Sequence, residues 1–83
     1  MRIADPKNVY SKEDFVDYIQ WLKEDLKTNS EEWENDRLDK FLDAMGRWTE
    51  TIEGYYNNTN QSLPENINWK VFADILAAAK IYE

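Results

Sequence analysis

Apolar residues recur at helical spacing in three stretches of the chain, and the middle stretch has the most regular pattern. On a helical wheel its large apolar side chains share one face, while charged residues occupy the other. The apolar set is Leu38, Phe41, Leu42, Met45, Trp48 and Ile52. This pattern predicts an amphipathic helix over about 36–53, capped by Asn35 and ended at Gly54, with its apolar face in the core.

The two flanking stretches predict a helix on each side of the middle one. Ser11 is typical of a cap for a helix over about 12–27, and Asn68 of a cap for a helix over about 69–82. The last helix is apolar around most of its circumference, so we expect it to be central and contacted on two sides. Lys80 points into its apolar arc, where it should extend to water or pair with an acid.

Ser30 and the acids after it predict a short extra helical turn near 31–34. Together the elements predict an all-α fold, a compact three-helix bundle. The chain has 83 residues, and one this short buries only roughly 60% of its unfolded surface. We therefore expect a single domain over 1–83. Residues 1–9 contain Pro6 and show no periodicity, which predicts a loosely packed N-terminal arm.

The composition bears on chemistry mainly through two missing residue types. Cysteine and histidine are both absent, which excludes disulfides, Cys/His zinc sites and imidazole acid–base catalysis. We find no motif for a metal or a cofactor and expect a protein that is not an enzyme. An enzyme using carboxylates alone is the remaining catalytic alternative. Its one candidate, Asp74, lies on the narrow polar strip of the last helix.

The net charge of −7 disfavours nucleic acid and anionic membranes as partners, because both require a basic surface. It is compatible with a basic protein partner, and also with a charge that only maintains solubility. The start of the chain does not resemble a signal peptide, and no apolar run reaches the roughly 18 residues of a membrane span. We therefore expect a cytoplasmic protein.

Acidic residues crowd the start of the middle helix: they are Glu31, Glu32, Glu34, Asp36 and Asp39. Two explanations compete for this cluster. Acids at a helix start are stabilised by the helix dipole. Alternatively, they form an electronegative patch that attracts a basic partner.

Two aromatic residues are further candidates for partner binding. Trp21 lies off the apolar stripe of the first helix, so it is either covered by the arm or another helix, or it anchors a partner. Tyr55 and Tyr56 follow Gly54. Adjacent tyrosines commonly place one ring in the core and one at its edge, and Tyr55 is our candidate for the exposed ring.

The chain also resembles a family of small bacterial domains of unknown function, on the residues Trp33-Glu34-Asn35 and the ending Ala78-Ala79-Lys80-Ile81-Tyr82-Glu83, with Gly54-Tyr55-Tyr56 between them. The resemblance extends over nearly the whole chain from about Val9. It implies a bacterial source and a small free-standing protein, and it carries no activity or catalytic residue.

These observations support a small acidic domain that binds another protein. One concrete version is an immunity-type protein that neutralises a basic toxin, with the acidic cluster for fast association and Trp21 or Tyr55 as an anchor. The alternative is a structural homo-oligomer, such as a homodimer. The alanines at 77–79 would let either a helix of this chain or a second copy approach closely.

Overall fold

The computed structural model describes residues 3–83 and contains no strand within that range. Its elements are η1 (Pro6–Asn8), α1 (Lys12–Thr28), η2 (Ser30–Glu32), α2 (Leu38–Glu50), α3 (Ile52–Asn58) and α4 (Trp69–Ile81), where η marks a 3₁₀ turn. The all-helical class is confirmed. The helix count is not, because four α-helices replace the expected three. The extra turn expected near 31–34 is present as η2, one residue earlier.

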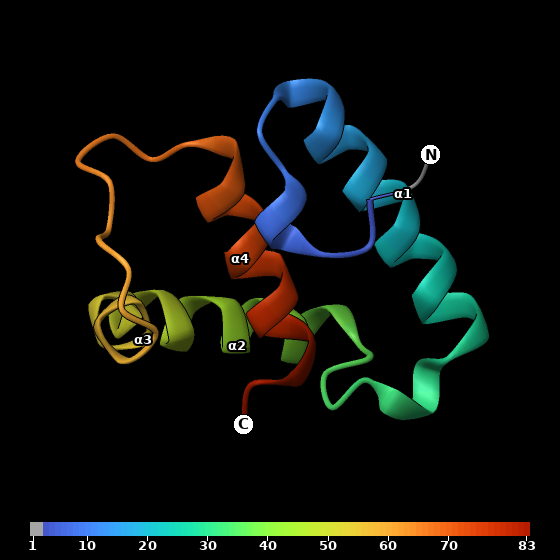
Figure 1. The fold of residues 1–83 in the computed structure, drawn as a ribbon. Helices are drawn as coiled ribbons and strands as arrows, with labels where there is room; N and C mark the ends of the chain where they lie inside the picture. Colours follow the sequence, from blue (N-terminus) through green and yellow to red (C-terminus); the bar gives the residue numbers. More distant parts are fainter. Residues whose placement is uncertain (1–2) are drawn as a thin grey trace.

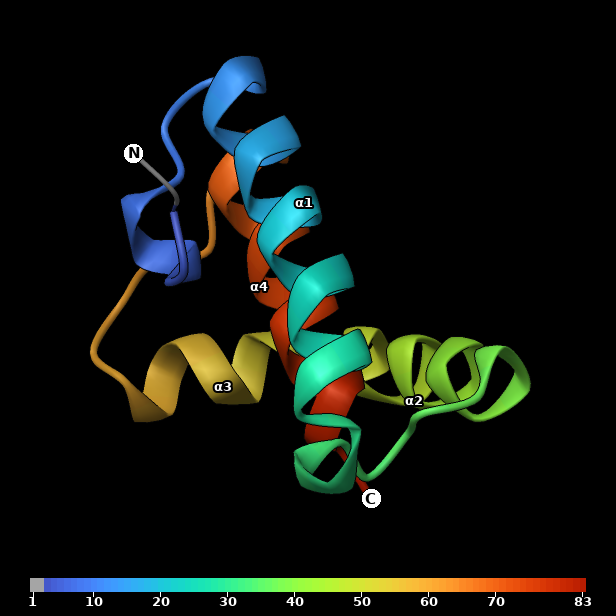
Figure 2. The same ribbon diagram turned by 90° about the vertical axis from the view of Figure 1, so that its right-hand side faces the viewer.

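Helix α4 lies at the centre of the molecule, as its nearly continuous apolar surface predicts (Figure 1). It is contacted by α1, by α2 and by η1. Helix α1 runs alongside α4 in the same direction, whereas α2 and α3 cross the C-terminal half of α4 and extend to opposite sides (Figure 2). Small residues permit this crossing, since Ala44 of α2 and Ala79 of α4 are both fully buried.

The caps of α1 and α4 are the ones that the sequence predicts. The hydroxyl oxygen of Ser11 accepts a hydrogen bond from the backbone N–H of Asp14 at 3.1 Å. The side-chain oxygen of Asn68 accepts one from the N–H of Val71 at 3.0 Å. Each cap satisfies a backbone donor that has no partner within the first turn of its helix.

The single helix expected over 36–53 is wrong. The structure has two helices in its place, of which the first starts later than expected and the second ends later. Helix α2 begins only at Leu38, after a cap residue, Arg37, that makes no capping hydrogen bond through its side chain. It stops at Thr51, whose hydroxyl donates a hydrogen bond to the carbonyl of Trp48 at 3.3 Å. Such a bond competes with the helical backbone pattern. Gly54 does not end the helix: it lies inside α3.

The N-terminal arm is not loosely packed where the structure describes it. Val9 is fully buried, and Ile3 packs against the same hydrophobic cluster. The backbone N–H of Ile3 donates a hydrogen bond to the carboxylate of Asp17 at 2.8 Å. The apolar side chains at 3 and 9 therefore anchor the segment on α1 and α4 despite its lack of periodicity. Residues 1 and 2 of the predicted arm lie outside the described residues.

The core consists of two hydrophobic clusters. One joins α1, the η2–α2 segment and α4 through Tyr18, Leu22, Trp33 and Ala73, and also includes Val9. The other joins α2, α3 and α4, and its buried residues are Trp48, Ile52, Tyr56 and Val71. Within residues 3–83, no helix has both the length and the apolar character needed to cross a bilayer.

Candidate functional site

The structure gathers the five predicted acidic residues on one segment and places the two aromatic candidates elsewhere. Glu31 and Glu32 belong to η2, and Glu34 and Asp36 lie on the link to α2. Asp39 occupies the first turn of α2, and all five acids are exposed. We call residues 29–37 the connector. The acidic cluster therefore covers the connector and the first turn of α2.

The helix dipole accounts for little of this cluster. Helix α2 starts at Leu38, so only Asp39 sits in its first turn, and the dipole acts within about one turn of the helix end. Asp39 also accepts a hydrogen bond from Arg37 at 2.9 Å. That bond is the main reason why the pKa of Asp39 is lowered. The other four acids lie before the helix, which leaves them free to form a negative surface.

Asp25 of α1 fixes the connector from one side. Its carboxylate oxygen Oδ2 accepts hydrogen bonds from the indole Nε1–H of Trp33 at 2.8 Å and from Nζ of Lys80 at 2.7 Å. Its other oxygen accepts one from the side-chain amide of Asn29 at 3.0 Å. The bond from Lys80 is the largest of the effects that lower the pKa of Asp25. The expectation that Lys80 pairs with an acid is thereby confirmed.

Asn35 fixes the connector from the other side, but it does not cap α2 as predicted. Its side-chain amide donates to the backbone carbonyls of Ala79 at 2.9 Å and Tyr82 at 2.7 Å. Its backbone N–H donates to the carbonyl of Lys80 at 3.1 Å. Asn35 thus satisfies carbonyls at the C-terminus of α4, which have no partner within the helix. No local sequence signal could reveal this partner, which lies more than 40 residues away.

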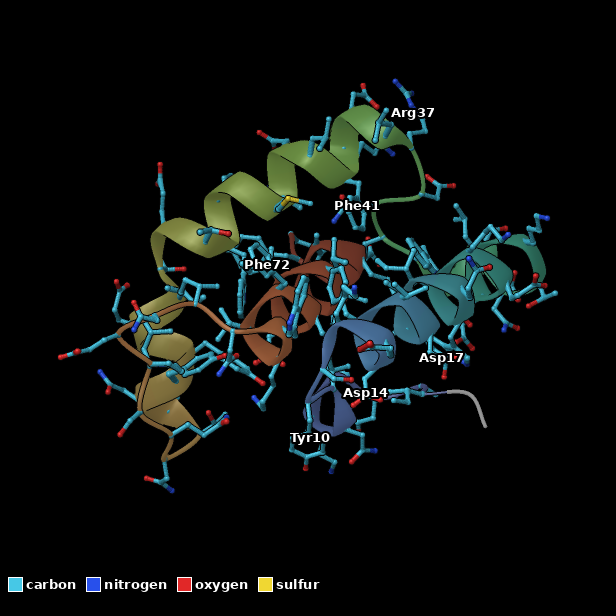
Figure 3. The ribbon with its side chains drawn as sticks, turned by 90° about the horizontal axis from the view of Figure 1, so that it is seen from above. Tyr10, Asp14, Asp17, Arg37, Phe41 and Phe72 are labelled. Carbon is cyan, nitrogen blue, oxygen red and sulfur yellow. The ribbon has the colours of Figure 1, made fainter. Side chains whose placement is uncertain are left out.

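An apolar pocket of about 260 Å³ opens beside the acidic cluster. Its lining residues are Leu26, Trp33, Asn35, Asp36, Arg37, Leu38 and Phe41. The rings of Phe41 and Trp33 stack with their centroids 6.0 Å apart. Figure 3 shows Phe41 on the inner side of α2 and Arg37 beside the N-terminus of this helix, pointing outward. The pocket therefore has an aromatic wall and a charged rim.

The apolar face of α2 continues out of this pocket onto the surface. Leu38 is 73% exposed and Leu42 is 53% exposed. We predicted both as core residues, and this prediction is wrong, because α2 turns Ala44 and Trp48 toward α4 instead. Contiguous apolar surface beside charged residues is a common feature of protein interaction sites. We call Leu38 and Leu42 the apolar edge of α2.

Trp21 is half-buried, with part of its ring covered by neighbouring side chains. Its ring stacks on Tyr18 with centroids 6.1 Å apart, and Nζ of Lys80 lies 5.6 Å from the ring centroid. Lys80 also lies 5.4 Å from the ring of Trp33, so its ammonium group contacts both tryptophans. Burial of Tyr18 beneath this layer is the main cause of its raised pKa, followed by the charge of Asp5. Neighbouring side chains thus cover part of Trp21, and its role in partner binding stays a prediction.

The tyrosine pair divides as expected, with Tyr56 almost fully buried and Tyr55 39% exposed. The hydroxyl of Tyr56 donates to the carboxylate of Asp74 at 2.5 Å, and burial together with this bond raises the pKa of Tyr56. Lys70 donates to the same carboxylate oxygen at 2.9 Å. Asp74 is buried rather than on an exposed polar strip, and its hydrogen-bond partners are a phenol and an ammonium group.

Comparison with known proteins identifies a family without an assigned activity. Among residues 3–83, no group of three or more acidic side chains is arranged to hold a metal ion. No curated protein and no solved structure matches the chain significantly. The family of unknown function DUF7660 matches residues 11–83. The chain therefore belongs to this family of unknown function.

Proposed function

We propose that this protein is a non-enzymatic domain that binds a basic partner protein through the acidic cluster and the adjacent pocket. The observation that carries the proposal is the position of five exposed acids around an apolar pocket, on a connector held by Asp25 and Asn35. Beyond the single 3₁₀ turn η2, the connector has no helix of its own to hold it. Here its hydrogen bonds to α1 and α4 keep the acids in one place before a partner arrives.

The two parts of the site have complementary roles in binding. Exposed acids attract a basic protein over a distance of about 10 Å at moderate salt, and so increase the association rate. The pocket and the apolar edge of α2 supply the buried contact that slows dissociation. A partner with one apolar side chain between lysines or arginines has the matching chemistry.

A more specific version of this proposal is an immunity-type protein of a bacterial cytoplasm that neutralises a basic toxin. Small size, a net charge of −7 and the absence of histidine and cysteine support it. The resemblance to small bacterial domains supports only the bacterial source, and its two most distinctive elements meet in space. Asn35 of the Trp-Glu-Asn element binds the carbonyls of Ala79 and Tyr82 in the C-terminal element.

A structural homo-oligomer is the alternative, with a different contact from the one that the sequence indicates. Ala79 is fully buried and Ala77 and Ala78 are half-buried, so the alanine run of α4 is largely used inside the chain. The apolar edge of α2 is the surface that a second copy would cover. A site with two carboxylates is not part of the proposal, because Asp74 is paired with Lys70 and Tyr56.

Site-specific photocrosslinking tests the proposal in cells of the source organism. A benzophenone amino acid replaces Leu38 in the pocket, and in the control it replaces Glu65 in the exposed loop after α3. We expect crosslinks to a basic protein from position 38 and none to that protein from position 65. The yield should fall when Glu34→Gln, Asp36→Asn and Asp39→Asn are combined, and stay unchanged with Glu50→Gln and Glu53→Gln.

Two results would contradict the proposal. Equal crosslinking from positions 38 and 65 would show that the pocket is not a binding site. A crosslink between two copies of the chain, together with a dimer in sedimentation, would establish the homo-oligomer instead.

A further inference from the structure

A second pocket, of about 370 Å³, is separate from the acidic cluster and shares no lining residue with the first. It lies where the C-terminal half of α4 meets η1 and the junction of α2 with α3. Its walls include Trp48, Tyr55 and Tyr82, with Asp74 and Glu83 as the acidic groups. The volume is within the range of roughly 300–1,000 Å³ that is typical of small-molecule sites.

Asp74 contributes a carboxylate of which only one oxygen is used. Its side chain is 5% exposed, and both of its hydrogen-bond donors, Tyr56 and Lys70, contact Oδ2. Within residues 3–83, Oδ1 accepts no hydrogen bond. Every fully buried side-chain oxygen in that range has a partner, so Oδ1 is not fully buried. Oδ1 therefore keeps some accessible surface, and Asp74 is a lining residue of the pocket. A carboxylate oxygen in such a place accepts a donor from a bound molecule.

The aromatic walls favour a positively charged group at the same place. Trp48 and Tyr55 both line the pocket, and their ring centroids lie 5.2 Å apart with the ring planes at an angle of 59°. Aromatic rings attract cations through their electron-rich faces. Tyr82 shows this property within the molecule, because the guanidinium of Arg47 lies 5.2 Å from its ring centroid.

We propose that this pocket binds an alkylammonium group, with the cation on Oδ1 of Asp74 and its hydrocarbon part against Trp48, Tyr55 and Tyr82. The group can belong to a free amine or to a lysine side chain. A metal ion fits less well, since Mg²⁺ and Ca²⁺ require about six oxygen ligands and most of the walls here are aromatic or aliphatic. The proposal does not depend on the function proposed for the acidic cluster.

NMR titration of the ¹⁵N-labelled protein with n-butylammonium tests the proposal, and n-butanol is the uncharged control. We expect butylammonium to shift the indole signal of Trp48 and the amides around Asp74, with saturation in the millimolar range. Butanol should shift them at least tenfold less at equal concentration. Equal shifts with butanol, or the absence of a saturable shift with butylammonium, would overturn the proposal.

Variants connect the binding to particular side chains. Asp74→Asn should weaken butylammonium binding at least tenfold. Tyr55→Ala should weaken it at least threefold. Asp36→Asn removes the same charge at the other pocket and should leave the binding unchanged. If Asp36→Asn weakens it as much as Asp74→Asn, the effect is the overall charge, and the proposed site is wrong. Tyr55 is partly exposed, so its variant tests the site even if Asp74→Asn does not fold.

A pair of capped peptides separates the two sources of the cation. If a peptide with one lysine reproduces the shifts and its acetyl-lysine analogue does not, the ligand is a lysine side chain of another protein. If only free butylammonium binds, the ligand is a small amine.

Discussion

The connector 29–37 and the loop 59–68 both link α-helices without forming one, yet the protein holds them in different ways. Side chains of the connector bond to residues far away in the sequence, as Asn35 does with Ala79 and Tyr82. The bonds of the loop reach only nearby parts of the sequence: the backbone N–H of Gln61 donates to the carbonyl of Tyr56, the hydroxyl of Thr59 donates to the carbonyl of Tyr55, and Lys70, nine residues on, donates to the side chain of Gln61 at 3.2 Å.

The difference shows which linking segment can support function. A segment tied to two helices keeps its side chains in place at little entropic cost when a partner binds. The loop has one side-chain bond to α4 and packs Leu63 against the core, so most of its exposed residues can change their path with little effect on the fold. The proposed binding site lies on the first type of segment, and the predictions below test that distinction.

The largest effect is expected for Asn35→Ala. The substitution leaves the carbonyls of Ala79 and Tyr82 without their donor, and each buried unsatisfied group costs about 1–3 kcal/mol. We expect the free energy of unfolding to fall by about 3 kcal/mol in urea denaturation. Asn66→Ala in the loop is the matched control, since Asn66 makes no side-chain hydrogen bond within residues 3–83, and its effect should stay below about 0.5 kcal/mol. Equal effects would remove the distinction between the segments.

Asp25→Asn should have the next largest effect, and that effect should depend on pH. Because the fold lowers the pKa of Asp25, its ionised form stabilises the protein above a pH of about 4, the usual value for aspartate. The stabilisation is lost as the pH falls through the lowered pKa. We expect a loss of about 2 kcal/mol at pH 7 that shrinks toward pH 3, measured by urea denaturation at each pH.

The control for this measurement is Asp43→Asn on the exposed side of α2. Asp43 pairs with Arg47, but both side chains are largely exposed, so the effect should be below about 1 kcal/mol at every pH. A loss for Asp25→Asn that does not change between pH 7 and pH 3 would mean that the charge of Asp25 does not stabilise the fold.

The smallest effect is expected for a Gly-Ser insertion between Glu65 and Asn66. Lengthening a flexible loop by two residues adds less than about 0.6 kcal/mol to its closure entropy. The melting temperature should therefore change by a few degrees at most. The same insertion between Glu34 and Asn35 moves Asn35 away from α4 and should lower the melting temperature far more. A loop insertion as harmful as the connector insertion would contradict the comparison.

Local signals predicted the parts of the fold that depend on nearby residues. Ser11 and Asn68 cap their helices because a cap binds a backbone group only three residues ahead. The periodicity of α1 and α4 gave their bounds to within one residue. Asn35 is the informative failure: its type suits a helix start, but the carbonyls of α4 compete for its amide.

The candidate site was predicted in part for the same reason. The acids of the cluster lie close together in the sequence, so the sequence alone located the stretch from Glu31 to Asp39. Its pocket was not foreseeable, because Leu26 and Phe41 come together only through the turn of the connector. The exposure of Leu38 and Leu42 was also hidden, since periodicity defines an apolar face but not how much of it a neighbouring helix covers.

The sequence by itself determined the helical class, the central place of the last helix and the acidic surface of the connector. These properties follow from residue type and spacing, which act locally. Only the tertiary structure decided the pairing of Asp25 with Lys80 and the bonds of Asn35 to α4. Those contacts join residues distant in the chain, and their geometry depends on how the helices pack against one another.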